Sequence, residues 1–133
     1  MFAKDGFQII EGVLSEAECD RLSEHLCTDE SRAGFRHLMS DPFVLALAFD
    51  ERLKAITTNI SGRPLIPYKA TLFQKTGKAN WLVPWHQDTT LPLESPPEGD
   101  GWGPSSVKDG ISFAHAPTLA LSNILALRVH LDA

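Results

Sequence analysis

The spacing of apolar residues changes near residue 64, and this change limits the possible folds more than any other feature of the chain. In residues 1–63, apolar side chains recur at intervals of three and four, which is typical of helices that bury one face. Residues 64–133 instead contain strand-like runs separated by turn residues and prolines. Helices followed by strands with long connections predict an α+β protein with a mainly antiparallel sheet. The length fits a single domain, 1–133.

Local signals indicate the helix ends in the first half. Ser15 and Glu18 form a capping-box pattern before a helix of about three turns. Asp41, which is followed by proline, is typical of a second helix start, and the apolar stripe that follows is expected to break near Asp50. Gly62 is expected to end this helical region, because glycine is common directly after a helix.

The second half is expected to supply most of the strands. Residues 92–118 hold five of the nine prolines and four of the nine glycines, so we expect a long irregular segment there. Loops of this length are uncommon in compact domains and are often functional, which makes a substrate lid one interpretation. The strand-like runs are residues 65–75, 81–88 and 124–132, with a short one earlier at 6–10.

The charge balance bears on partners and location. The formal net charge is −5, and no run of basic residues offsets it locally, so we expect neither a nucleic acid nor a membrane as a partner. No segment approaches the roughly 20 apolar residues of a membrane span. The first residues lack the pattern of a signal peptide, so a cytoplasmic location is expected.

The clearest chemical signal is the pair His86 and Asp88, which flank Gln87. Side chains two residues apart point to the same side of an extended strand, and their Cα atoms would lie roughly 6.6 Å apart. An imidazole nitrogen and a carboxylate oxygen could then bind one metal ion, as in the two-histidine, one-carboxylate triad of non-haem Fe(II) oxygenases. The tripeptide alone is a weak signal, because most such sequences are solvated or take part in ordinary hydrogen bonds.

A third ligand would have to come from elsewhere in the chain. His115, in the segment rich in proline and glycine, has no accompanying motif. His130 shares one face of the last expected strand with Arg128, and a cation beside a metal ion is unfavourable. The better interpretation is that neither histidine is a ligand. A cupin-like site for a different metal would require a His-x-His pair, which the sequence lacks.

Short segments in a fixed order extend this signal over most of the chain. They are Gly6-Phe7 with Glu11–Ser15, Leu72–Lys75, Ala79–Trp81, Val83–Asp88 and Leu127–Asp132. In this order they resemble the phytanoyl-CoA dioxygenase family of Fe(II)- and 2-oxoglutarate-dependent oxygenases. The ordered set is much more specific than the tripeptide.

The resemblance implies a fold, a chemistry and a set of site residues. The implied fold is a partial double-stranded β-helix, the jelly roll of cupins, with N-terminal helices packed on the sheet. His86 and Asp88 match two iron ligands, and Gln87 matches a residue near the cosubstrate 2-oxoglutarate. Thr71 and Arg128 fall on strand positions that can face this cosubstrate. The implied activity is Fe(II)-dependent hydroxylation of a small organic molecule or an acyl-CoA-like substrate.

The sequence departs from the family pattern at its C-terminal end. In the family, the strand matching Leu127–Asp132 leads to an Asn-Gly turn, then to Gly-x-His with the distal iron ligand, and then to an arginine that binds 2-oxoglutarate. The sequence ends at Ala133. We therefore expect the N-terminal part of an oxygenase, which would bind iron weakly and could self-associate through exposed sheet edges. The alternative is a non-catalytic remnant or binding module that retains part of the fold.

Overall fold

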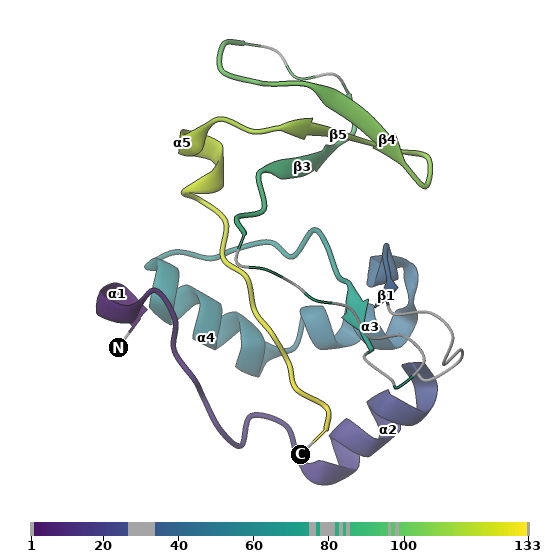
Figure 1. The fold of residues 1–133 in the computed structure, drawn as a ribbon. Helices are drawn as coiled ribbons and strands as arrows, with labels where there is room; N and C mark the ends of the chain where they lie inside the picture. Colours follow the sequence, from purple (N-terminus) through teal and green to yellow (C-terminus); the bar gives the residue numbers. More distant parts are fainter. Residues whose placement is uncertain are drawn as a thin grey trace. The chain divides into compact units, whose positions relative to one another are not determined.

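Two compact units make up the chain. In a computed structural model, Met1–Leu82 together with Leu127–Ala133 form the first unit, and Val83–Ala126 form the second. Most helices belong to the first unit and the longer strands to the second (Figure 1). The expectation of a single domain stays a prediction. The residues that the structure describes are 2–26, 34–74, 77, 82, 84, 86–95, 97 and 99–132.

Helices dominate the first unit, as the apolar spacing predicts. They are α1 (Phe2–Asp5), α2 (Glu16–Leu26), the 3-10 helix η1 (Leu38–Ser40), α3 (Pro42–Ala48) and α4 (Glu51–Ser61). The three longer helices each contribute one buried apolar side chain: Leu22 from α2, Val44 from α3 and Leu53 from α4. Each of these helices therefore buries one face and leaves the other to solvent.

The predicted helix ends are confirmed by hydrogen bonds at each position. The Ser15 N–H donates to Glu18 Oε2 at 2.8 Å, and the Glu18 N–H donates to Ser15 Oγ at 3.3 Å, which is a capping box. Asp41 caps α3 by accepting from two backbone N–H groups at 2.9 and 3.1 Å, and Asp50 caps α4 by accepting from one at 2.8 Å. Gly62 follows α4 with φ 72°, the left-handed conformation that glycine adopts readily.

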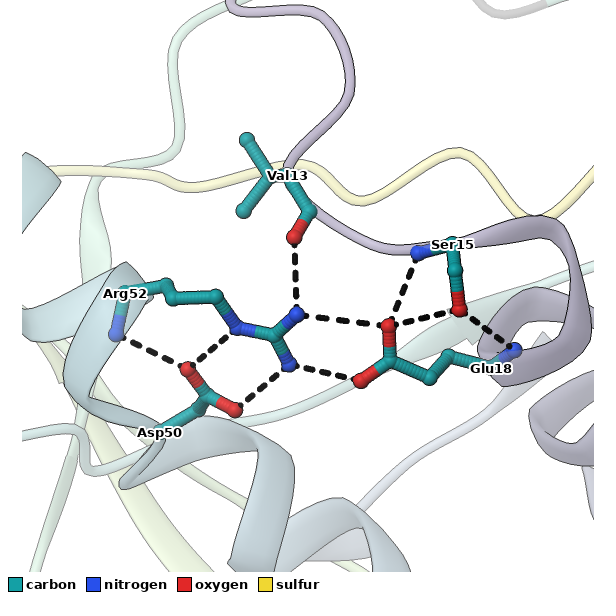
Figure 2. Close-up of polar contacts among 5 residues, drawn as sticks. All are labelled: Val13, Ser15, Glu18, Asp50 and Arg52. Carbon is teal, nitrogen blue, oxygen red and sulfur yellow. Dashed lines mark hydrogen bonds and ion pairs between the residues drawn. The ribbon is translucent and has the colours of Figure 1, made fainter.

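A cluster of polar groups joins the starts of α2 and α4 (Figure 2). The Arg52 guanidinium donates to Glu18 Oε1 at 2.7 Å and to Asp50 Oδ2 at 2.8 Å, and it also donates to the Val13 carbonyl at 2.9 Å. The hydrogen bonds from Arg52 lower the pKa of Glu18 and of Asp50 to about 2 each. The side chains are 25% to 44% exposed, so solvent screens these pairs. We call Val13, Ser15, Glu18, Asp50 and Arg52 the Arg52 cluster.

The second unit contains a three-stranded antiparallel sheet and a short helix. The sheet order is β3-β5-β4, with β5 in the centre (Figure 1). The buried side chains of β5 are Phe113, which is 4% exposed, and Ala114, which is fully buried. The bounds are β3 (Thr90–Leu93), β4 (Ser105–Lys108), β5 (Ile111–His115) and α5 (Thr118–Leu121).

The expectation of an irregular segment at residues 92–118 is wrong for residues 105–115, because β4 and β5 form a hairpin there, whereas the described residues between β3 and β4 carry no helix or strand. Asp109 and Gly110 connect the two strands and have φ values of 51° and 80°. Positive φ at both central residues is the geometry of a type I′ turn, for which Asp-Gly is a favoured sequence. Glycines and prolines thus lie at the turns between the strands of a sheet. The basis for interpreting the segment as a lid is lost.

The strands expected elsewhere are shorter than predicted or not formed. The structure assigns no strand to residues 6–10 or 124–132, and in 65–74 it assigns only β2 (Leu72–Phe73). This strand pairs antiparallel with β1 (Gly34–Phe35). Apolar alternation predicts how side chains would point, but a strand also needs a partner that accepts its backbone hydrogen bonds. Several residues of the expected strand 81–88 lie outside the described residues.

The described elements confirm the α+β class, with helices alongside two small antiparallel sheets. None of the described helices combines the length and apolar character required to cross a bilayer. These elements do not by themselves establish the jelly-roll arrangement.

Candidate functional site

The orientation of the His86 ring is set by a nearby carbonyl group. His86 Nδ1 lies 2.8 Å from the carbonyl oxygen of Pro84. A carbonyl oxygen can only accept, so Nδ1 must carry the hydrogen and donate it. In the neutral ring, Nε2 then has the free lone pair. Metal-binding histidines are commonly held in this way, by donating the other ring N–H to a backbone carbonyl.

Asp88 presents its carboxylate near this nitrogen. His86 Nε2 lies 3.7 Å from Asp88 Oδ1, beyond hydrogen-bond distance. Two ligands in adjacent positions of an octahedral ion, each about 2.1 Å from it, lie about 3 Å apart. A small side-chain rotation would close that difference, and the side chains are 56% and 85% exposed and have room to rotate. The structure therefore places the two predicted side chains close together, at a separation longer than that of two adjacent ligands of such an ion.

The segment that carries this pair also borders a pocket, but with other side chains. Gln87 and Thr89 line a pocket of about 400 Å³, whereas His86 and Asp88 do not. The alternation is that of an extended backbone, in which successive side chains point to opposite sides. The segment thus has one face formed by His86 and Asp88, which we call the His86–Asp88 face, and a pocket face, formed by Gln87 and Thr89.

His115 belongs to the pocket and not to the His86–Asp88 face. Its Nδ1 lies 3.0 Å from Thr89 Oγ1, and its side chain lines the pocket. Among the described residues, no three His, Cys, Asp or Glu side chains are grouped closely enough to hold one metal ion. A third protein ligand for His86 and Asp88 is therefore not found in the part of the chain that the structure describes.

The other residues predicted for the site lie in the first unit. Thr71 is half-buried and directly precedes β2, while Arg128 is exposed in the C-terminal segment. The histidine of that segment, His130, is also exposed. His86 and Asp88 lie in the second unit, so the predicted role of Thr71 and Arg128 at a shared cosubstrate stays a prediction.

Sequence reasoning did not identify Thr89 or the pocket. The sequence did contain a signal for Thr89, because the alternation of side chains along an extended segment places residues 87 and 89 on one side, just as it places 86 and 88 on the other. What the sequence could not show is the return of β5 and α5 to enclose that face, since this depends on long-range pairing.

Comparison of the chain with protein-family models, with curated proteins and with solved structures found no match in any of the three sets. The functional argument therefore rests on the residues of this chain.

Proposed function

We propose that the chain belongs to an Fe(II)- and 2-oxoglutarate-dependent dioxygenase of the phytanoyl-CoA dioxygenase type, which hydroxylates a small organic molecule or an acyl-CoA-like substrate. The observation that carries the proposal is the hydrogen bond from His86 Nδ1 to Pro84, which leaves Nε2 free beside the Asp88 carboxylate. The order of segments that resemble the family supports the same chemistry.

The chain's own residues would contribute binding and orientation. His86 Nε2 would supply a neutral nitrogen ligand, and the Pro84 carbonyl would keep its lone pair directed at the ion. Asp88 would supply a negatively charged oxygen, which offsets part of the ion's charge. The bound iron and its cosubstrate would supply the oxidation of 2-oxoglutarate to succinate and CO₂ that is coupled to hydroxylation.

The proposal also covers the fold and the cellular location of the protein. The antiparallel sheet β3-β5-β4 is the kind of sheet from which a jelly roll is built, so we propose a partial double-stranded β-helix. The net charge of −5 and the lack of a basic run fit a cytoplasmic protein that acts on a small molecule.

An anaerobic Fe(II) titration tests the metal pair. His86→Ala or Asp88→Ala should weaken Fe(II) binding at least tenfold, because each removes one of two protein ligands. The chain offers a matched control, since His130 and Asp132 have the same His-x-Asp spacing. His130→Ala should leave the affinity unchanged. Equal Fe(II) affinity in the His86, Asp88 and His130 variants would exclude the proposed site.

A second measurement addresses the alternative, a non-catalytic binding module. The observation that favours this alternative is the exposure of the Asp88 side chain, which is 85% accessible to solvent. Succinate formation from 2-oxoglutarate in the presence of Fe(II) and O₂, abolished by His86→Ala, would support the enzyme. Tight binding of Fe(II) without succinate formation would support the binding module.

A further inference from the structure

The pocket in the second unit has a composition that restricts what it can bind. Its volume of about 400 Å³ lies within the range of small-molecule sites. Among the described residues, polar side chains without formal charge provide most of the lining, and two apolar side chains provide the rest. The lining residues are Gln87, Thr89, His115, Ala116, Thr118, Leu121 and Ser122.

The polar groups of the pocket are held in place by hydrogen bonds. Thr89 Oγ1 lies 3.0 Å from His115 Nδ1, and the Ser122 hydroxyl donates to the Thr118 carbonyl at 2.7 Å. The backbone adds a second link, because the Ala116 N–H donates to the Thr89 carbonyl at 2.9 Å. Since the Ser122 hydrogen is used, its hydroxyl oxygen is left to act as an acceptor. Hydroxyl, amide and imidazole groups together offer both donors and acceptors.

These properties separate three classes of ligand. A carboxylate or phosphate would lose hydration and find no lysine or arginine among the lining residues that the structure describes, which is unfavourable. An apolar ligand would cover the hydroxyl and amide groups without replacing their hydrogen bonds to water. A neutral molecule with several hydroxyl groups can donate and accept at each polar group and lay its carbon skeleton against Leu121 and Ala116.

We propose that this pocket binds a small neutral polyhydroxylated molecule, of the size of a monosaccharide or polyol. The site lies on the pocket face of residues 87 and 89, and its binding groups are distinct from His86 and Asp88. The proposal can therefore be tested without metal.

The test is an NMR titration of the full chain with D-glucose, with D-glucose 6-phosphate and cyclohexanol as the charged and the less polar probes. Glucose should cause saturable shifts of the backbone amide signals of Gln87, Thr89 and Ser122, at millimolar concentrations. Neither other probe should reach the same affinity. Absence of saturable shifts with glucose, or tighter binding of the phosphate, would overturn the proposal.

Two variants locate the binding. Thr89→Val keeps the shape of the side chain and removes the hydroxyl, and Ser122→Ala removes an acceptor, so each should raise the glucose Kd about threefold to tenfold. Ser106→Ala, on the exposed strand β4, removes a hydroxyl outside the pocket and should leave the Kd unchanged. If Thr89→Val disturbs the fold, Ser122→Ala decides the question. An unchanged Kd in Ser122→Ala would contradict binding in this pocket.

Discussion

Single atoms define the chemistry of Pro84 and residues 86–89. The Pro84 carbonyl fixes which nitrogen of His86 is free, because it can only accept a hydrogen bond. On the opposite face, a hydrogen bond between Thr89 Oγ1 and His115 Nδ1 orients the His115 ring. Both histidines are exposed, so hydrogen bonds rather than packing orient them.

The tautomer of His86 can be observed directly. We expect the neutral ring to carry its hydrogen on Nδ1, since the Pro84 carbonyl accepts from that nitrogen. Side-chain ¹⁵N NMR above pH 8 measures this, with exposed His130 as the control for a ring in solvent. A hydrogen located on Nε2 of His86 would remove the main support for the proposed binding of a metal by His86 and Asp88.

At the scale of the elements, helix ends are predictable from sequence and strand pairing is not. Ser15, Asp41 and Gly62 act on backbone groups two to four residues away, so the sequence contains all the participants. The β3–β5 pairing joins Thr90 to His115 and has no such local signal. The Asp109-Gly110 turn was predictable in principle, but the density of glycine and proline around it favoured a loop. Arg52 was missed because its partner Glu18 is on another helix.

The Arg52 cluster should make the stability of the first unit sensitive to acid. Glu18 and Asp50 have ordinary pKa values of 4.5 and 3.8 but about 2 in the folded chain. The unfolded chain therefore binds more protons between about pH 5 and pH 2, and stability falls as the pH is lowered through this window. Urea unfolding at a series of pH values should show this fall.

Asp41 also contributes to this pH dependence, because its pKa is lowered, mainly by its hydrogen bond with His25. Arg52→Gln should raise the pKa of Glu18 and Asp50 but leave that of Asp41 lowered, so it should roughly halve the pH dependence of stability. Lys54→Gln replaces a cation of the same helix outside the cluster and serves as the control. If the two variants show the same pH dependence, the guanidinium is not the cause.

At the scale of the whole molecule, each unit has its own buried side chains. Leu22, Val44 and Leu53 serve the first unit, while Phe113 and Ala114 are the buried apolar residues described in the second. The second unit thus depends heavily on the aromatic side chain of Phe113. Lys108 Nζ lies 5.3 Å from the centre of the Phe113 ring. The candidate site is formed within this unit, so its geometry depends on the same side chain.

Phe113→Ala should therefore destabilise the second unit by about 3–5 kcal/mol, because it leaves a cavity where a 4% exposed ring was packed. Leu119→Ala, whose side chain is 79% exposed on α5, should change stability by less than about 0.5 kcal/mol. Urea unfolding followed by NMR signals of residues 105–115 measures both. A small effect of Phe113→Ala would mean that this ring does not form the core of the sheet.

The alternation at residues 86–89 has a consequence for how this segment can vary. A substitution at 86 or 88 changes one face alone, and a substitution at 87 or 89 changes the other, so the two faces can diverge separately. A one-residue insertion or deletion before Thr89 has a different effect, because it exchanges the sides on which the side chains lie. Point substitution can therefore tune either face by itself, whereas any change in the length of this short stretch alters both at once.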